Sequence, residues 1–378
     1  MSLAGQIQVN TNYTRSINLE RDADSLAIVN AYIPTTRALD TLARVGETIT
    51  TVKSMPRAWT LMGPYGSGKS SFAVFLSHLL GAADDVATDA AQAVLARCNE
   101  IVIDQFWDEN GESLEHCRVF LTGSPEPLSK RLAKSLHEGA TAFFSRGQRQ
   151  YPLVLEQLAQ LSAQDHITVT ETIDAINQLQ EAVASAGGYG VLIVIDELGK
   201  FLEYEARHPE ANDIYLLQVL AEQAYKGHEK GAILSVFVLL HQSFEQYARG
   251  LGRTQRNEWA KVQGRFEVIP FLESTEQTLR IVSKAVEQPK KLPKAVAKET
   301  EQLSALLSQW KALPNTLDQH SANQLFQQCY PLHPISALLL PLLCQKVAQN
   351  ERTLFNYLGS TEAFGFQDSL KRLERLGD

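Results

Sequence analysis

Cysteine is scarce in this chain of 378 residues: there are four, and no two of them form a CxxC pair. None lies beside the spaced cysteines and histidines of a zinc site. We therefore expect four free, buried thiols and a reducing, cytoplasmic compartment.

Long hydrophobic runs and an excess of basic residues are also missing. No apolar stretch approaches the roughly 20 residues that span a bilayer, and the N-terminus lacks the apolar core of a signal peptide. We expect no membrane contact. The net charge is −8, so any contact with nucleic acid would have to be a local patch. The 44% apolar content excludes a wholly disordered chain.

Short apolar runs alternate with helical patterns over the first 272 residues or so. The runs 59–62, 118–122, 191–195 and 233–240 predict buried parallel strands. Helical patterns cover 34–54, 69–80, 128–145, 168–186 and 211–226, whereas residues 1–24 are polar and loop-like. This alternation predicts a layered α/β fold with a mainly parallel sheet.

The pattern changes near residue 274, after which only helices are predicted, at 275–287, 296–312, 321–329, 335–349 and 361–376. We expect three parts. They are an N-terminal segment with a helix that packs on the core (1–58), an α/β core with a helical insertion around 81–190 (59–273), and an all-α lid domain (274–378).

Residues 63–70 read GPYGSGKS and fit the phosphate-loop pattern G-x-x-x-x-G-K-[ST] at every fixed position. Glycines let successive N–H groups turn toward phosphate oxygens, and the following helix adds its N-terminal amides. Lys69 can reach the β- and γ-phosphates, and the hydroxyl of Ser70 can bind Mg²⁺. The predicted nucleotide-binding residues of this segment are Gly63, Pro64, Tyr65, Gly66, Ser67, Gly68, Lys69, Ser70 and Ser71.

A second candidate half-site follows the apolar run 191–195, which ends in Asp196 and Glu197. Parallel sheets bind ligands at the carboxyl ends of their strands. Asp196 would therefore hold Mg²⁺, directly or through water, and Glu197 could act as the general base for the attacking water. The pattern predicts a P-loop NTPase with a three-layer α/β/α fold.

The Asp-Glu pair resembles the P-loop ATPases that have an additional strand between the phosphate-loop strand and the Mg²⁺ strand, the AAA+ and STAND branch. The resemblance implies ATP and Mg²⁺ as ligands and ATP hydrolysis as the activity. The run 118–122, or another run in the long insert, can provide the additional strand. The N-K-x-D motif with which GTPases read their base is absent.

The same resemblance suggests roles for several polar residues. His241 or Gln242, at the end of the run 233–240, would be the sensor of the γ-phosphate or of the attacking water. Gly264-Arg265-Phe266-Glu267 looks like the motif whose arginine reaches the nucleotide of a neighbouring subunit, which implies self-association. A lid arginine that contacts nucleotide is also expected; Arg352 is the candidate and Arg280 the alternative.

The basic cluster around Arg265 has two other interpretations. With Trp259 it could form a nucleic-acid patch that includes an aromatic side chain, or it could be a solvated basic loop. The cluster consists of Arg249, Arg253, Arg256, Lys261 and Arg265.

Three longer strings, 196–203, 258–266 and 349–355, resemble large ATPases of bacterial antiphage defence systems of the bacteriophage-exclusion type. We therefore expect the motor or switch of a multi-component bacterial system, with other system proteins as partners. Two alternatives remain open. One is a nucleotide-dependent scaffold that does not hydrolyse ATP. The other is an origin-recognition-like or STAND ATPase that senses or loads on nucleic acid through the basic stretches 249–265 and 290–298.

Overall fold

The computed structural model describes residues 3–10, 17–51, 53–107, 111–146, 153–226, 231–288, 292–347 and 354–373. The chain divides into two compact units. The first consists of Ile17–Gly63 and Gly68–Phe271 and contains an α/β core. The second consists of Met1–Ser16, Pro64–Ser67 and Leu272–Asp378 and is mainly helical. The domain boundaries expected from the sequence stay predictions.

The core of the α/β unit is a five-stranded sheet in the order β3-β4-β5-β2-β6, and every neighbouring pair in it is parallel. All four predicted strands are present, and β6 is added to them. The strands are β2 (Ala58–Met62), β3 (His116–Thr122), β4 (Gly190–Asp196), β5 (Ile233–Leu240) and β6 (Glu267–Pro270).

The additional strand between the phosphate-loop strand and the strand of Asp196 is β5. The expectation that the run 118–122 or another run in the insert fills this place is wrong, because β3 lies at the edge of the sheet and pairs only with β4. The burial patterns give the physical reason. Every residue of β5 is buried, as a central strand requires, whereas burial in β3 alternates toward its end.

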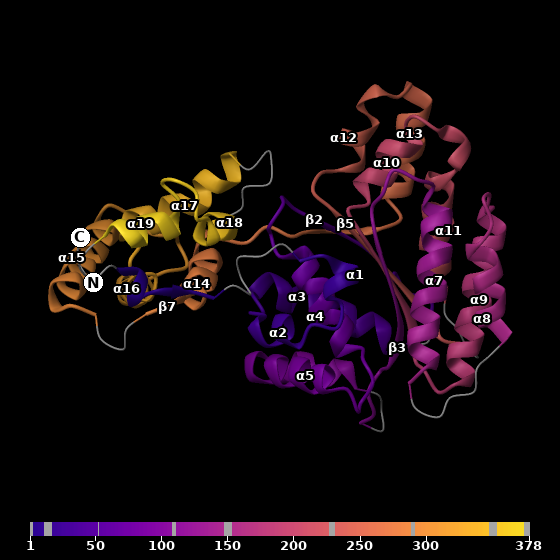
Figure 1. Ribbon diagram of the computed structural model, residues 1–378, viewed down its shortest axis with the longest axis horizontal. Coiled ribbons are helices and arrows are strands. Elements are labelled where there is room, and N and C mark those ends of the chain that lie inside the picture. Colours follow the sequence, from indigo (N-terminus) through magenta and orange to yellow (C-terminus); the bar gives the residue numbers. More distant parts are fainter. Residues whose placement is uncertain are drawn as a thin grey trace. The chain divides into compact units, whose positions relative to one another are not determined.

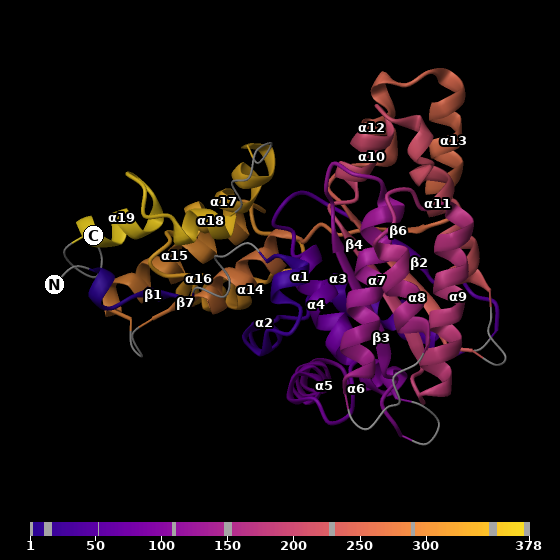
Figure 2. The same cartoon turned by 45° about the vertical axis from the view of Figure 1, so that its right-hand side comes forward.

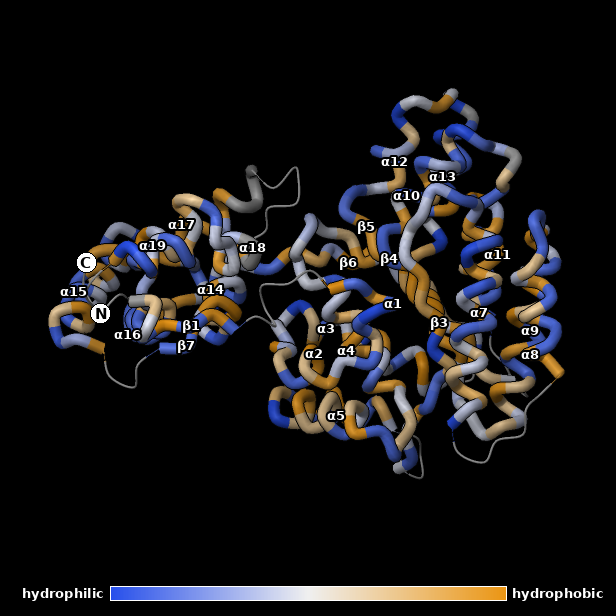
Figure 3. The backbone as a smooth tube through the Cα atoms, in the orientation of Figure 1, coloured by the Kyte–Doolittle hydropathy of each residue, from blue (hydrophilic) through white to orange (hydrophobic). Residues whose placement is uncertain are grey.

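Helices cover both faces of the sheet (Figure 1). Alternate residues of β4 point to opposite faces, so Val191, Ile193 and Ile195 belong to one hydrophobic cluster and Leu192 and Val194 to the other. The first cluster includes α7 (Leu128–Phe144), α9 (Val169–Ser185) and α11 (Asp213–Tyr225). The second includes α3 (Thr36–Ile49), α4 (Lys69–Leu79) and α5 (Val86–Cys98). The strands are the hydrophobic centre of this three-layer α/β/α fold (Figure 3).

Seven further α-helices complete the described α/β unit. They are α1 (Leu19–Asp22), α2 (Leu26–Ala31), α6 (Glu100–Ile103), α8 (Leu153–Ser162), α10 (Gly199–Glu205), α12 (Phe244–Tyr247) and α13 (Arg253–Gln263). In two views, α10, α12 and α13 lie together at one end of the unit (Figures 1 and 2).

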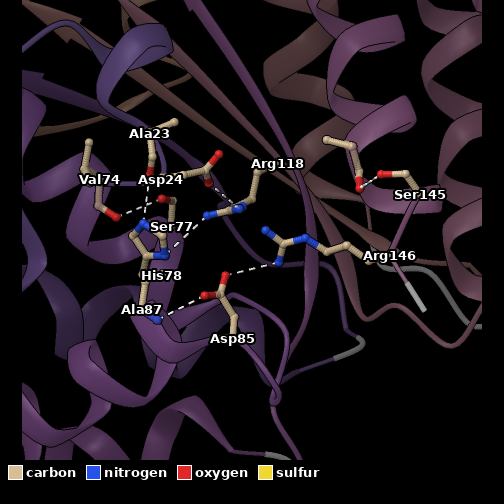
Figure 4. A network of polar contacts seen from close by, with 11 residues as sticks. Ala23, Asp24, Val74, Ser77, His78, Asp85, Ala87, Arg118, Ser145 and Arg146 are labelled. Atoms are coloured by element: carbon tan, nitrogen blue, oxygen red, sulfur yellow. Dashed lines mark hydrogen bonds and ion pairs between the residues drawn. The ribbon is translucent and has the colours of Figure 1, made fainter. Parts of the chain in front are cut away.

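The segment before α2 is tied to the core by polar contacts (Figure 4). The ring of His78 on α4 is bonded to the carbonyl oxygen of Ala23 through Nε2 (2.7 Å), and Arg118 of β3 pairs with Asp24 (3.0 Å). Asn18 caps α1 by accepting a hydrogen bond from the backbone of Arg21. Part of the stretch that the sequence predicts as loop-like therefore forms a helix docked on the sheet.

The second unit is helical apart from a two-stranded antiparallel sheet, in which β1 (Gln8–Val9) pairs with β7 (Val286–Glu287). This pairing corrects the all-α expectation, since the predicted helix 275–287 gives way to a strand at the β-branched Val286. The helices are α14 (Thr275–Ala285), α15 (Lys294–Gln309), α16 (Gln319–Gln328), α17 (Pro334–Val347), α18 (Leu354–Gly359) and α19 (Phe366–Arg372).

Cys98, Cys117 and Cys329 carry free thiols, as predicted. Cys98 is exposed at the end of α5, so the expectation that all the thiols are buried is wrong for this residue. The side chain of Cys344 lies outside the described residues. Within the described part of the chain, no helix is both long enough and apolar enough to span a membrane.

His116 gives the fold a dependence on pH. His116 is 2% exposed at the start of β3. Burial lowers its pKa to about 4, and the positive charge of Arg57 adds to this effect. In the unfolded chain, His116 has its ordinary pKa near 6.5. Above that pH the ring is neutral in both states, so protonation takes nothing from the free energy of unfolding. Between pH 6.5 and 4 only the unfolded chain binds the proton, so the free energy of unfolding falls as the pH falls, by up to about 1.4 kcal/mol per pH unit.

We expect His116→Gln to flatten the decline of unfolding free energy between pH 6.5 and 4, measured by urea unfolding at several pH values. Glutamine can keep the hydrogen bond that the ring makes to the carbonyl oxygen of Leu114. The exposed His166 provides the control variant, His166→Gln. An equal pH slope in the wild type and in both variants would show that His116 is not the group responsible.

Candidate nucleotide-binding site

The phosphate loop connects the carboxyl end of β2 to the first residue of α4. The N–H of Gly63 donates to the carbonyl oxygen of Leu240 at the end of β5 (3.0 Å). Gly66 and Gly68 have φ angles of 72° and 87°, a left-handed conformation that glycine adopts without steric cost. Helix α4 starts at Lys69 with no side chain capping it, so its first amides are directed at the loop.

Lys69 lies over this loop rather than in solvent. Its side chain is buried, and Nζ donates to the carbonyl oxygen of Gly63 (2.6 Å). Burial lowers the pKa of Lys69 to about 8, and the negative charges of Asp196 and Glu197 oppose this effect. The loop therefore holds a poorly hydrated cation, which favours an anionic ligand.

The two predicted half-sites meet at Ser70 and Asp196. Ser70 Oγ donates to Asp196 Oδ2 (2.7 Å), and the N–H of Glu197 donates to Asp196 Oδ1 (2.8 Å). Burial raises the pKa of Asp196, whereas these two hydrogen bonds lower it. A hydroxyl and a carboxylate thus lie side by side next to the cationic loop.

These oxygens fit Mg²⁺ in a particular way. Mg²⁺ prefers oxygen ligands and is commonly held by one or two protein groups, with water and substrate phosphates completing the shell. Among the described residues, no group of three or more His, Cys, Asp or Glu side chains could hold a metal by itself. Ser70 and Asp196 therefore suit an ion that is shared with a phosphate ligand.

Glu197 directly follows β4 in a left-handed conformation with a φ angle of 51°. Its carboxylate forms an ion pair with Lys200, which lies in the first turn of α10. The strand ends pack closely here, because a Cβ added to Gly123 would lie 2.1 Å from the carbonyl oxygen of Glu197. The candidate general base is therefore at the expected edge, with an ammonium group beside it.

His241 follows the end of β5 at the same edge. Tyr247 Oη lies 3.0 Å from Nε2 of its ring and 3.1 Å from Nδ1. Burial lowers the pKa of His241, and the positive charge of Lys69 adds to this effect, so the neutral imidazole is favoured. The half-buried Gln242 follows it.

Two residues at this edge were not found from the sequence. Tyr247 packs so closely on α10 that a Cβ on Gly199 would lie 2.2 Å from its hydroxyl oxygen. No sequence signal points to this contact. Lys200 could have been found, because its position three residues after Glu197 at the start of a helix suggests an ion pair.

Arg265 does not join this edge of the sheet. Arg265 precedes β6, whose first residue pairs with Trp59, the second residue of β2. Arg265 therefore lies toward the amino ends of the strands. There it pairs with Glu222 (2.8 Å). Arg352 lies outside the described residues, and Arg280 pairs with Glu276 on its own helix.

Trp259 is 4% exposed and packs in the core, so it offers no face on which a base could stack. The interpretation that Trp259 contributes an aromatic side chain to a nucleic-acid patch is therefore wrong. In the second basic stretch, Lys290 and Lys291 lie outside the described residues.

No family model matches the chain, and a search of curated proteins finds no match. Among solved structures, the chain is similar to the ORC2 protein of Aeropyrum pernix in its ADPNP-ADP complexes, with 10% identity and a TM-score of 0.42. That match covers 84% of this chain and 75% of the other. The ADP form of the same protein matches with 10% identity and a TM-score of 0.40, over 85% and 76% of the two chains.

Lys69→Ala is expected to weaken ATP binding by at least about tenfold, because a charged hydrogen bond to phosphate contributes about 1.5–3 kcal/mol. The measurement is titration with a fluorescent ATP analogue in the presence of Mg²⁺. Lys134→Ala is the control, since Lys134 is an exposed lysine on α7. Unchanged affinity in Lys69→Ala would remove the phosphate loop as the binding site.

Proposed function

We propose that this chain binds ATP with Mg²⁺ at the phosphate loop and hydrolyses it to ADP and phosphate. The observation that carries the proposal is the hydrogen bond between Ser70 Oγ and Asp196 Oδ2. It joins the start of α4 to the carboxyl end of β4, and both oxygens are of the kind that Mg²⁺ prefers. The resemblance to ATPases favours ATP over GTP.

In the proposed reaction, the oxygen of a water molecule attacks the γ-phosphorus and the bond to the β–γ bridging oxygen breaks. Glu197 accepts the proton that the water loses. Lys69 and the loop amides hold the phosphate oxygens, and Ser70 and Asp196 would hold Mg²⁺, which supplies positive charge beside the phosphates when bound. His241, with Gln242 next to it, would orient the water or contact the γ-phosphate.

The position of Arg265 supports a role in a second copy of the chain. Within one copy it lies toward the amino ends of the strands, whereas the phosphate loop follows their carboxyl ends. Each strand residue advances the chain by about 3.3 Å. The distance from the amino end of a strand to its carboxyl end is therefore longer than an arginine side chain can reach. Arg265 would therefore stabilise transition-state charge in a neighbouring copy, released from Glu222.

A second candidate is a nucleotide-dependent switch that does not hydrolyse ATP. The ion pair between Glu197 and Lys200 favours it, because the carboxylate that would accept a proton from water is held by a neighbouring ammonium group. In this case nucleotide binding would select one conformation of the chain, and a partner would recognise that conformation.

The wider role that we propose is the motor or switch of a multi-component bacterial system, with antiphage defence as the setting. The support is the resemblance of strings 196–203, 258–266 and 349–355 to ATPases of such systems. The first string contains Glu197 and Lys200, so the resemblance extends over the residues next to the proposed Mg²⁺ ligands.

Glu197→Gln is expected to lower the rate of phosphate release by at least about 100-fold while ATP affinity stays within about twofold, because a general base contributes about 10²–10⁴-fold. Phosphate release and nucleotide affinity are measured on the same preparation. If the wild type releases phosphate no faster than Glu197→Gln while both bind ATP, the switch replaces the ATPase as the function.

A mixing experiment tests whether Arg265 acts between copies. Lys69→Ala binds ATP weakly but supplies Arg265, whereas Arg265→Ala keeps the phosphate loop intact but lacks the arginine. Each variant alone is expected to hydrolyse ATP at least about 10³-fold more slowly than the wild type, and their mixture should recover activity. A mixture as inactive as its components would contradict action between copies.

A further inference from the structure

The arginines of the described chain differ in whether they have a partner. Most form an ion pair with a carboxylate or donate to backbone carbonyl oxygens. The ion-paired set is Arg21, Arg44, Arg118, Arg131, Arg146, Arg265, Arg280 and Arg372. Arg57 and Arg97 donate to carbonyl oxygens. Within the described ranges, five arginines have no such partner: Arg37, Arg207, Arg249, Arg253 and Arg256.

Three of these five lie within eight residues of one another, and we call Arg249, Arg253 and Arg256 the arginine patch. Arg249 belongs to a short 3₁₀ turn, Ala248–Gly250, and the other two lie one turn apart at the start of α13. All three are exposed. The segment sits at the end of the α/β unit where α10 and α12 also lie (Figure 2).

Carboxylates near the patch do not neutralise it. Glu258 on α13 is paired with Lys261 (2.8 Å), and Glu222 on α11 is paired with Arg265 (2.8 Å). Glu245 on α12 is exposed and has no ion pair with the patch in the described structure. In a chain with a net charge of −8, this segment therefore presents a local excess of positive charge.

The segment that carries the patch has a polar outer surface. The inner side of α13 carries Trp259 and Val262 into the core, and no large hydrophobic side chain is exposed in the described residues from 244 to 266. Protein interfaces usually bury aromatic or aliphatic anchors, which this surface lacks. The planar guanidinium matches the oxygens of a phosphate group, and such contacts need no apolar anchor.

We propose that the arginine patch binds the phosphate backbone of a nucleic acid. This contact is separate from the nucleotide site and does not depend on ATP hydrolysis. Because Trp259 is buried, the patch has no aromatic platform for bases, so the contact is to the backbone and independent of base sequence.

The test compares Arg253→Ala/Arg256→Ala with the matched control Arg37→Ala/Arg207→Ala in the full chain. Both variants remove two exposed, unpaired arginines. Binding of a fluorescent DNA duplex is followed by anisotropy between about 50 and 200 mM salt. For the patch variant we expect about tenfold weaker binding at low salt. The slope of its plot of log affinity against log salt concentration should be smaller in magnitude by about two, because each phosphate contact contributes about 0.9 to that slope.

The control variant should bind like the wild type, with the same salt slope, and thermal unfolding confirms that both variants fold. Equal losses in the two variants would show a diffuse charge effect and overturn the proposal. Failure of the wild type to bind DNA at low salt would do the same. Polyglutamate is the competitor: displacement of DNA at equal charge concentration would mean that the patch recognises acidic protein instead.

Discussion

The parallel register of β2, β5 and β4 is the constraint on which the site depends. Met62 pairs with Leu240, and Ile195 pairs with Val238, so the three strands end at one edge of the sheet. The phosphate loop, the acid pair and His241 follow the ends of these strands. The N–H of Gly63 donates to the carbonyl oxygen of Leu240 at the end of β5. A shift of register would separate these loops, because side chains and strand ends move together.

Burial shapes the electrostatics at this edge. It lowers the pKa of Lys69 and raises that of Asp196, which means that both side chains lose water around their charges. Each charge partly compensates the other, and Asp196 also accepts hydrogen bonds from Ser70 and the backbone of Glu197. Groups arranged in this way before a ligand arrives need little reorganisation to bind a phosphate and its cation.

Arginine has two uses in the α/β unit. Arg118, with its partner Asp24, holds the N-terminal segment against β3, and Arg57 closes the end of α3 by donating to backbone carbonyl oxygens. The arginine patch has no such structural partner. Tyr247, two residues before the patch, is hydrogen-bonded to His241 and packs on Gly199, so the segment that carries the patch also supports the candidate nucleotide site.

Local patterns in the sequence were enough to predict the phosphate loop, four strands of the sheet and the acid pair after β4. Those features depend on neighbours along the chain: glycines that allow positive φ angles, continuous apolar runs, and a lysine and serine at the start of a helix. The place of β5 in the sheet, the pairing of β1 with β7 and the burial of Trp259 depend instead on which distant segments pack together. Tertiary structure also packed Tyr247 on Gly199 and put Arg265 at the far end of the strands, since hydrophobic packing and strand pairing, rather than sequence spacing, decide which distant groups become neighbours.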